Sequence, residues 1–474
     1  MWARALVAAL AIALAAPALA TAAADPLSVK HNRIVDARGR QVILHGANTV
    51  FKRPPYYPPL TAADFRRMRS WGFNTIRLGV IWAGLEPQPG QIDQDYINHL
   101  QAIVALAARE RFWVLLDMHQ DLYAERFTGE GAPEWAVLDD GIPFTPAAGD
   151  FALNYASPAV GRAFTSFWTD RDGIRTEYVR AFTALAQRFA GSPAVLGYDL
   201  FNEPSCEFQL GPPCGLPPEP PVATQFLMPL YDQLVPALHA ADPKHPAFYE
   251  DSPTVNFGYP FLIGSPDGPE WPYPNQGLSH HVYCSPDLRA GVSCPAQERQ
   301  AVVNAIASAR HNDVAALQTE FGATDDLATL RRVTADEDAA GEGWLYWQYK
   351  TYDDPTTSSS AGPGGADAES IVAVDGRVKR AKVGVLARAY PERIAGSGAR
   401  WSFDPRTGVF SLSYTPRGSG PTVVVAPAPA YPRGACTTGR GFTQSRDPER
   451  DRLRLRADRG ARHVSFRAFP CPSS

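Results

Sequence analysis

The sequence predicts an α/β fold: a closed (β/α)8 TIM barrel over residues 25–392, followed by a small C-terminal β-sandwich over residues 393–474. Eight short apolar runs alternate with longer stretches of helical periodicity, which is typical of a parallel sheet buried on both faces. Beyond Tyr390 the runs become short and alternating and are separated by Gly and Pro, which indicates a sandwich. A doubly wound open sheet is the alternative, but no Gly-rich phosphate loop follows the first strand.

The elements can be placed in chain order. A small hairpin is expected at residues 30–42, with its turn at Asp36–Gly39. The barrel strands are then expected at residues 42–47, 74–80, 113–118, 195–200, 245–250, 277–283, 315–319 and 344–347. The helices are expected at residues 62–71, 93–109, 158–189, 224–240, 295–310, 325–340 and 377–390. The sandwich strands are expected at residues 401–414, 422–425, 451–455 and 464–468.

The third of these sandwich strands carries a row of arginines. Arg452, Arg454 and Arg456 alternate with leucines, so a strand places the three guanidinium groups on one face. A solvated strand face is the preferred interpretation, and a patch for anionic lipid or glycan is the alternative.

The first 24 residues have the pattern of a secretory signal peptide. Arg4 gives a positive start, residues 5–16 form an apolar run, and Ala18–Ala20 supplies the small residues that signal peptidase prefers. The run is short for a membrane span, and no other stretch reaches about 18 apolar residues. We therefore expect a secreted protein, with a retained N-terminal anchor as the alternative.

The six cysteines fit an exported protein and fall into three local pairs. Because short loops close most readily, we expect disulfides within each pair, namely Cys206–Cys214, Cys284–Cys294 and Cys436–Cys471. A metal site is the alternative, but no CxxC or HxxxH spacing accompanies the cysteines, so no metal is expected. The formal net charge of −4 does not suggest a nucleic-acid partner.

Two glutamates follow predicted barrel strands. Glu203 ends the apolar run LGYDLFNEP, and Glu320 lies in LQTEFGA. The carboxyl ends of barrel strands meet at one mouth, so the two side chains can face each other. A retaining glycosidase needs such a pair, about 5 Å apart: one protonated carboxyl for the leaving oxygen and one carboxylate to attack the anomeric carbon. A structural ion pair is the ordinary interpretation of either residue alone.

Other polar side chains end neighbouring strands and favour the catalytic interpretation. They are Arg77 on the second strand, His119 and Asp121 after the third, and His281 and Tyr283 on the sixth. A cation and a hydroxyl donor near Glu320 would favour its ionised form, whereas apolar walls around Glu203 would hold that carboxyl protonated.

Three loops after strands are rich in aromatic residues, at positions 51–60, 122–144 and 257–273. They lie on the barrel face where active sites are built. They could form a slot for an apolar substrate group, and the plainer interpretation is that they pack on each other as satellite cores.

A family resemblance follows from the motifs. Seven motifs occur in the same order along the predicted barrel and resemble those of family 5 of the glycoside hydrolases. They are HGAN at His45–Asn48, NTIRLG, LLDMHQD, FNEP, HHVY, TEFG and WLYW. Within that family the chain is similar to endoglycoceramidases, which release the intact glycan from ceramide. This similarity rests on three features: DMHQD followed by GEGAPEWAV, NTVFKRPPYYP after the first strand, and the sandwich after the barrel.

The resemblance implies roles for individual residues. Glu203 would be the acid/base and Glu320 the nucleophile, with Asn202 on the sugar 2-hydroxyl and Tyr283 hydrogen-bonded to the nucleophile. The first sugar subsite would be lined by Lys52, His119, Asp121 and Trp347, with Trp347 as a stacking platform and Trp344 as the alternative platform.

It also implies a glycosphingolipid substrate, peripheral contact with a lipid membrane or micelle surface, no cofactor, no nucleic acid and a monomeric state. The insert at residues 206–221 and the loop at 355–367 depart from the pattern near the mouth. Alternatives within the barrel family are a glucosylceramidase, a galactosyl-series endoglycosidase or a β-glucanase. A glycan- or membrane-binding barrel without catalysis is the alternative outside enzymes.

Overall fold

The structure is a computed structural model, and it describes residues 25–472 apart from 149–150, 206–221, 266–267, 286–288, 290, 353, 357–364, 419 and 448–450. The predicted signal peptide and the Cys206–Cys214 pair therefore lie outside the described residues. No helix in the described part of the chain is long and apolar enough to cross a membrane.

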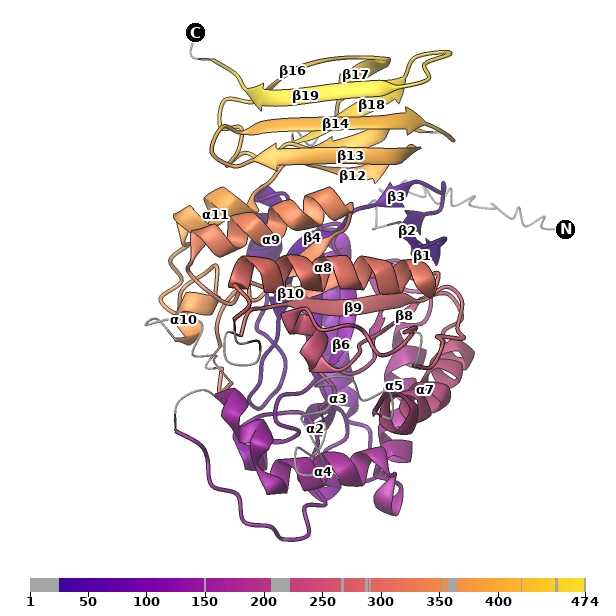
Figure 1. The fold of residues 1–474 in the computed structure, drawn as a ribbon, viewed down its shortest axis with the longest axis vertical. Coiled ribbons are helices and arrows are strands. Elements are labelled where there is room, and N and C mark those ends of the chain that lie inside the picture. The colour runs from indigo at the N-terminus through magenta and orange to yellow at the C-terminus, as the bar shows by residue number, and fades with distance from the viewer. Residues whose placement is uncertain are drawn as a thin grey trace, which may run out of the picture.

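Eight parallel strands close a barrel in the order β10-β11-β4-β5-β6-β7-β8-β9 (Figure 1), so the predicted fold class is confirmed. The strands are β4 (His45–Thr49), β5 (Thr75–Ile81), β6 (Trp113–His119), β7 (Val195–Asp199), β8 (Ala247–Tyr249), β9 (Gly277–Val282), β10 (Ala315–Phe321) and β11 (Trp344–Tyr346). The main outer helices are α1 (Ala62–Ser70), α3 (Gln94–Arg109), α5 (Ile174–Phe189), α7 (Met228–Ala241), α8 (Cys294–His311), α9 (Leu327–Ala340) and α11 (Arg380–Leu386). Short helices α2 (Trp82–Leu85), α4 (Pro158–Trp168) and α10 (Ala366–Glu369) lie in the connections.

Local signals set where these helices begin. Thr61 and Asp64 form a capping box at the start of α1, and Asp93 and Asp326 accept backbone N–H groups at the starts of α3 and α9. Every residue of β5 and β6 is buried, because the barrel interior covers one face and the helices cover the other. Polar residues inside such strands are therefore confined to the barrel interior or to buried pairs.

Three predicted barrel elements differ from the structure. The helix predicted over residues 377–390 is the shorter α11, because the chain leaves helical geometry after Leu386 and Tyr390 belongs to β12. The first strand begins at His45 rather than at residue 42, because Val42 pairs antiparallel with Arg393 in a different sheet. The helix predicted over residues 158–189 is two helices, α4 and α5. Asp170, Asp172 and Gly173 between them have positive φ angles, which break helical geometry.

The sandwich has one sheet of seven strands, in the order β1-β2-β3-β12-β15-β18-β17, and one of four, in the order β13-β14-β19-β16. Its C-terminal strands are β12 (Tyr390–Ile394), β13 (Gly396–Asp404), β14 (Val409–Pro416), β15 (Thr422–Val425), β16 (Ala435–Arg440), β17 (Phe442–Arg446), β18 (Arg452–Ala457) and β19 (Val464–Pro470). The N-terminal strands β1 (Leu27–Lys30), β2 (Arg33–Asp36) and β3 (Gln41–Val42) extend the larger sheet beside the barrel floor (Figure 1). The predicted division at residue 392 falls inside β12.

A second apolar core fills the space between the two sheets and is separate from the barrel core. Trp401, Phe403, Phe410, Leu412 and Phe466 are among its buried members. Strands β16 and β17 were not predicted, because ACTTGR and FTQSR are polar and Gly-containing and lack the apolar alternation of a half-buried strand.

The arginine row of β18 is not uniformly solvated. Arg454 and Arg456 are exposed, as a solvated face requires, but the prediction is wrong for Arg452, which is buried. Its guanidinium is held by Glu392 at 2.8 Å and Asp451 at 2.6 Å. The buried cation is tolerated because two carboxylates compensate it.

Two of the three predicted disulfides are present, Cys284–Cys294 and Cys436–Cys471. The second closes a loop of 35 residues and ties β16 to the C-terminal end of the chain. We expect the variant Cys436→Ser/Cys471→Ser to lose about 3–4 kcal/mol of unfolding free energy and Cys284→Ser/Cys294→Ser, which opens a shorter loop, to lose about 1 kcal/mol less. Chemical denaturation with and without reductant measures both values, and equal losses for the two variants would contradict the loop-length argument.

Candidate active site

The mouth of the barrel brings the two predicted catalytic glutamates together. Glu203 follows β7, and Glu320 is the penultimate residue of β10. One carboxylate oxygen from each and one ring nitrogen of His281 lie within 4.8 Å of one another. An upper limit of 4.8 Å between these oxygens fits the gap of roughly 5 Å in retaining glycosidases better than the gap of roughly 6.5–9.5 Å that inverting enzymes keep for a water.

Glu203 is held by two side-chain contacts. Asn256, in the short helix at Pro253–Phe257, donates to Oε1 at 2.7 Å, and His281 Nδ1 lies 2.8 Å from the same oxygen. The residue has a φ of +43°, and its backbone N–H donates to Glu250 at 2.9 Å, which fixes the turn after the strand. Burial raises the pKa of Glu203 above its ordinary value, and the contact with His281 offsets only part of the shift. A raised pKa suits a proton donor.

Glu320 is surrounded by donors instead. Arg77 Nη1 donates to Oε1 at 2.6 Å, the hydroxyl of Tyr283 donates to Oε2 at 2.9 Å, and His281 Nδ1 lies 3.5 Å from Oε2. Because Arg77 and Tyr283 donate to different oxygens, they fix the orientation of the carboxylate. The two glutamates face each other but have different hydrogen-bond partners. Such a difference is needed if one is to act as the acid and the other as the nucleophile.

His281 lies between the two carboxylates, and their charges favour its protonated form. Burial disfavours its charge, but Glu320, Glu250 and the hydrogen bond to Glu203 outweigh burial and raise the pKa of His281 well above its ordinary value. Its Nε2 lies 3.4 Å from Glu250. An imidazolium here balances part of the negative charge of the pair.

Arg77 is the centre of a wider network below the mouth. Its guanidinium contacts four carboxylates and the amide oxygens of Asn48 and Asn202; the carboxylates are Asp117 at 3.0 Å, Asp199 at 2.8 Å, Glu250 at 3.1 Å and Glu320 at 2.6 Å. Burial opposes the charge on Arg77, but these carboxylates raise its pKa well above the ordinary value. Burial also raises the pKa of Asp199 to about 8, although Arg77 opposes the shift. Asn202 has both amide groups engaged, since its nitrogen donates to the Gln120 carbonyl at 2.9 Å.

A second polar cluster lies beside the pair and contains the remaining predicted binding residues. Lys52 donates to Asp121 at 2.5 Å, and His119 Nδ1 lies 2.7 Å from Asp117. Trp347 forms the wall, because its ring stacks on His119 with centroids 5.4 Å apart and Lys52 Nζ lies 4.6 Å from its centroid. Burial lowers the pKa of His119, but Asp117 outweighs it, and the resulting pKa is about 10.

The alternative platform, Trp344, does not reach this cluster. Its ring is fully buried and stacks on His45 with centroids 4.2 Å apart, near the start of β11. Trp347 is three residues further along the chain and therefore lies at the mouth. Of the two tryptophans, only Trp347 contacts the polar cluster beside the pair.

Three residues that line this region were not predicted from sequence. Glu130 lies 3.6 Å from both Lys52 and His119, and neither of its carboxylate oxygens has a hydrogen-bond partner among the described residues. Thr356 accepts from Lys52 at 2.5 Å, and Asp354 lies 3.4 Å from the same amine. Glu130 and Asp354 belong to long loops, and a rule based on strand ends does not reach them. The Gly-flanked GEG at Gly129–Gly131 was the available signal for Glu130.

The aromatic loops are mostly packed. Phe127, Phe261 and Leu262 are buried, and Trp271 stacks on Tyr249 with centroids 3.9 Å apart. The satellite-core interpretation therefore holds for these side chains. Tyr56 and Tyr57 are only half-buried.

Asn256 provides a test of how Glu203 is tuned. A hydrogen bond to the ionised carboxylate favours that form, so Asn256→Ala should raise the pKa of Glu203 further. We expect the alkaline limb of the pH dependence of kcat/KM to move to higher pH and kcat to fall, because Glu203 also loses an orienting contact. Asn98→Ala, on the exposed face of α3, is the matched control. An unchanged alkaline limb would show that Asn256 does not act through Glu203.

Comparison with known proteins places this site in a family. Residues 35–353 match Cellulase (glycosyl hydrolase family 5), and residues 388–466 match the Glycoside hydrolase family 5 C-terminal domain. Endoglycoceramidase I of Rhodococcus hoagii (strain 103S) is 32% identical over 424 residues, which cover 86% of this chain and 81% of the relative. Endoglycoceramidase of Hydra vulgaris is 29% identical over 432 residues, which cover 83% and 78%.

Solved structures agree. Endo-glycoceramidase II from Rhodococcus sp. superposes with a TM-score of 0.76 at 28% identity, covering 92% of this chain and 99% of that one. The same enzyme has been solved as a lactosyl-enzyme intermediate, with a TM-score of 0.77 at 27% identity and the same shares covered. The match to the catalytic family spans the whole barrel up to residue 353, including both glutamates of the mouth. This protein is a glycoside hydrolase and belongs to glycoside hydrolase family 5.

Proposed function

We propose that the protein is a secreted retaining endo-β-glycosidase that hydrolyses the bond between oligosaccharide and ceramide in glycosphingolipids. The observation that carries the proposal is the Glu203–Glu320 pair, whose oxygens lie within 4.8 Å beside a ready-made polar subsite. The endoglycoceramidases that match over more than four fifths of this chain supply the substrate class.

The reaction runs in two displacements. Glu320 attacks the anomeric carbon while Glu203 gives its proton to the ceramide oxygen, so ceramide leaves as an alcohol and the glycan becomes an ester of Glu320. Glu203, now ionised, then takes a proton from a water that attacks the same carbon, which frees Glu320 and the sugar with retained configuration. Arg77 and Tyr283 hold Glu320 for both steps, since each donates to a different carboxylate oxygen.

The polar cluster beside the pair would bind the sugar next to the cleaved bond. Trp347 offers a ring face, and Lys52, His119, Asp121 and Glu130 offer charged groups to sugar hydroxyls. Glu130 supports this role because its buried oxygens have no protein donor among the described residues, and a hydroxyl would supply one. Burial raises the pKa of Glu130 well above its ordinary value, which Lys52 opposes.

Product analysis tests the substrate. Mass spectrometry after incubation with lactosylceramide, glucosylceramide and a cello-oligosaccharide should show intact lactose and ceramide from the first and little release from the others. Glucose from glucosylceramide as the main product would favour a glucosylceramidase, and shortened cello-oligosaccharides would favour a β-glucanase. Tight glycolipid binding without any product would favour a binding protein.

Secretion is supported by the N-terminal pattern and by the two disulfides, which form in oxidising compartments. The first strand starts at Leu27, so cleavage near residue 24 would leave the fold whole. N-terminal sequencing of protein from the medium should give a start close to residue 25, and an uncleaved chain in the membrane fraction would favour an anchor. Light scattering tests the monomer, and flotation with glycolipid vesicles tests peripheral membrane contact.

A further inference from the structure

A cluster of buried polar side chains lies on the outer face of the barrel sheet, under α9. His280 is in β9, Gln318 is in β10, Glu337 is in α9, and Glu342 is in the loop between α9 and β11. All four residues are at most 4% exposed. Ligand atoms of His280, Glu337 and Glu342 lie within 4.8 Å of one another. We call these four residues the α9 cluster.

The α9 cluster is separate from the catalytic pair. His281 contacts Glu203 and Glu320 inside the barrel. Successive residues of a strand point to opposite faces, so His280 faces the outer helices instead. Gln318 is paired with His280 in the β9–β10 ladder and shares that outer face. The cluster is therefore a second site, and its properties do not depend on the proposed function.

Most polar atoms of the α9 cluster have no protein partner. Nε2 of His280 lies 3.0 Å from Oε1 of Glu342. Six other atoms lack a hydrogen-bond partner among the described residues: Nδ1 of His280, both amide atoms of Gln318, both carboxylate oxygens of Glu337 and Oε2 of Glu342. Buried polar atoms in proteins are nearly always hydrogen-bonded, so such a concentration of unpartnered atoms indicates that a ligand belongs there.

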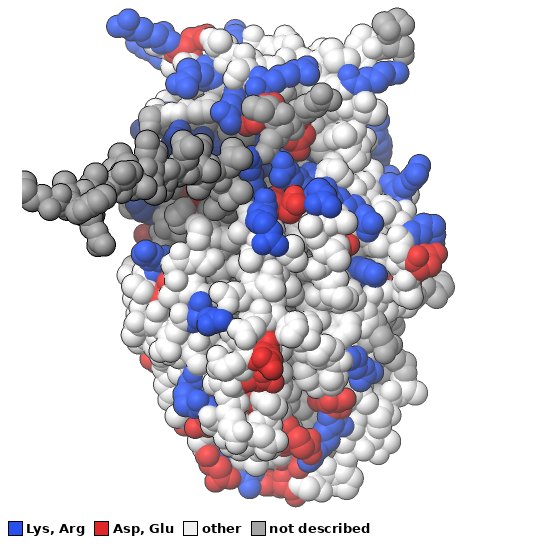
Figure 2. Space-filling view, turned by 180° about the vertical axis from the view of Figure 1, so that it is seen from behind, with Lys and Arg blue, Asp and Glu red and all other residues white. Residues whose placement is uncertain are grey.

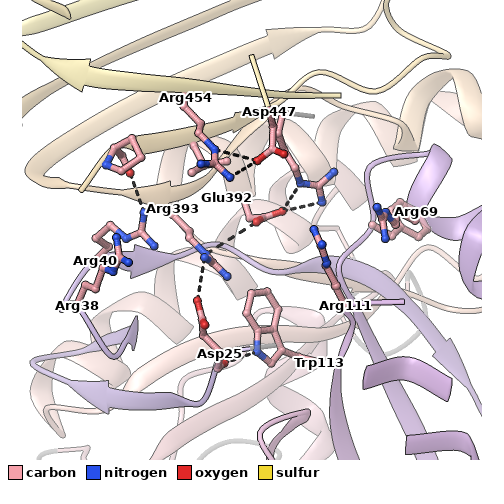
Figure 3. A pocket seen from close by; sticks show the side chains of 14 residues that line it. Asp25, Arg38, Arg40, Arg69, Arg111, Trp113, Glu392, Arg393, Asp447 and Arg454 are labelled. Carbon is pink, nitrogen blue, oxygen red and sulfur yellow. Dashed lines mark hydrogen bonds and ion pairs between the residues drawn. The ribbon is translucent and has the colours of Figure 1, made fainter. Parts of the chain in front are cut away.

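The two carboxylates also lack a compensating Lys or Arg. Lys and Arg side chains gather at the surface around the junction of barrel and sandwich (Figure 2). Arginines hold Glu392 in that junction, where Arg452 lies 2.8 Å from the carboxylate (Figure 3). Among the residues that the structure describes, however, no Lys or Arg forms an ion pair with Glu337 or Glu342. A protonated His280 compensates one carboxylate, and the second then needs a proton or a bound cation.

A metal ion satisfies this cluster better than a proton. One proton bridges only two carboxylate oxygens, and the other acceptors stay without a partner. A metal ion takes several acceptors at once. Two ligand atoms that each lie about 2.0 Å from a tetrahedral zinc ion are about 3.3 Å apart, and the 3.0 Å between His280 and Glu342 is close to that spacing.

We propose that the α9 cluster binds one divalent transition-metal ion, best fitted by Zn²⁺, through His280, Glu337 and Glu342. Imidazole nitrogen together with carboxylate oxygen suits Zn²⁺, whereas sites made of oxygen alone suit Mg²⁺ and Ca²⁺. The amide oxygen of Gln318, which neighbours His280 across the ladder, is the candidate for a fourth ligand. The ligands come from separate elements, so no short spacing motif marks them in the sequence.

An ion has a route to the α9 cluster from solvent. A cavity of about 290 Å³ lies where the barrel floor meets the sandwich, and Glu342 lines it together with Gly341, Gly343 and Trp401. Glu342 therefore borders the cavity and belongs to the cluster. A bound ion would tie β9 to α9 and to the loop that follows it, and would stabilise the folded chain.

Metal content and thermal stability of the mature full-length chain test the proposal. Protein loaded with Zn²⁺ and dialysed against metal-free buffer should retain about one zinc ion per chain by inductively coupled plasma mass spectrometry. EDTA should lower the melting temperature, because a ligand that binds only the folded form stabilises it. Zn²⁺ alone should restore the melting temperature, and Ca²⁺ or Mg²⁺ should not. None of these measurements uses the glycolipid substrate.

Glu337→Gln separates a metal ion from a proton. The amide keeps the shape of the carboxyl group without its charge, and Zn²⁺ should bind at least about 100-fold more weakly, since even the loss of a partner of a metal ligand costs about 10- to 100-fold. Asp336→Asn is the matched control: it removes the same charge one residue away on α9, where Asp336 lies 3.6 Å from Arg299, and should leave Zn²⁺ binding unchanged. Chelator competition measures both affinities.

Three results would overturn the proposal. The first is a parent protein that retains no zinc and has the same melting temperature in EDTA and in Zn²⁺. The second is equal Zn²⁺ affinity in Glu337→Gln and Asp336→Asn, which would assign the ion to other residues. The third is stabilisation by Ca²⁺ or Mg²⁺ in place of Zn²⁺. If Glu337→Gln does not fold, the responses of the parent protein to EDTA and Zn²⁺ decide alone.

Discussion

Glu320→Gln is expected to reduce turnover by roughly 10⁴- to 10⁶-fold on every substrate, including activated aryl glycosides. The amide cannot attack the anomeric carbon, and no leaving group compensates for a missing nucleophile. Glu203 does not replace it, because Glu203 is bound by Asn256 and His281 and its pKa is raised by burial. Initial rates with lactosylceramide and with an aryl lactoside measure the loss.

The same variant should fold normally. Arg77 keeps Asp117, Asp199 and Glu250 after Glu320 is neutralised, so no buried cation is left alone. Removing one of several crowded carboxylates also relieves repulsion, and we expect a melting temperature equal to or above that of the parent. Glu134→Gln, at an exposed position, is the control for the substitution itself. Unaltered activity of Glu320→Gln would refute the assigned nucleophile, and a large thermal loss would show that its main role is structural.

The sequence pattern predicts the barrel well because the barrel repeats one physical unit. Each of the eight strands is buried on both faces and therefore appears in the sequence as an apolar run. These runs are easy to recognise because they alternate with helices. The errors occur where a segment pairs with a strand outside the barrel. Val42 looks like part of the first barrel strand, yet it pairs with Arg393, which is 351 positions away in sequence. A local pattern carries no information about such a partner.

The active-site residues also divide into those that the sequence pattern could predict and those that it could not. Glu203, His281 and Glu320 could be grouped in advance, since each lies near the end of a barrel strand or follows one, and the topology brings these ends together. Arg77 lies inside β5 rather than at its end, and its long side chain reaches Glu320 from there. The residues missed, such as Glu130 and Asn256, sit in loops whose path depends on packing. Glu250 directly follows β8, but the neighbouring sequence does not show whether its carboxylate binds Arg77 or faces water. Prediction therefore reached the residues that the fold places and missed those that tertiary packing places.

Glu203→Gln is expected to separate the two displacements. With lactosylceramide the rate should fall roughly 10²- to 10⁴-fold, since the ceramide alkoxide is a poor leaving group without a proton. With an aryl lactoside of low leaving-group pKa the first displacement needs no acid, so a burst of phenol is expected. The second displacement then stalls, because no base activates water, and the lactosyl-enzyme accumulates on Glu320. Intact mass measurement should show the added disaccharide.

The pH dependence supplies an independent test of the same residue. Because burial raises the pKa of Glu203, the parent enzyme should hold its acid protonated above the ordinary carboxyl range and lose kcat/KM as pH rises through that raised pKa. In Glu203→Gln, a permanently neutral side chain, this alkaline limb should vanish for the aryl substrate. Azide, a nucleophile that needs no base, should restore turnover and give a β-glycosyl azide, since attack on the intermediate inverts a second time. An α-azide would contradict the covalent intermediate, and a persistent alkaline limb would assign the proton donor to another group.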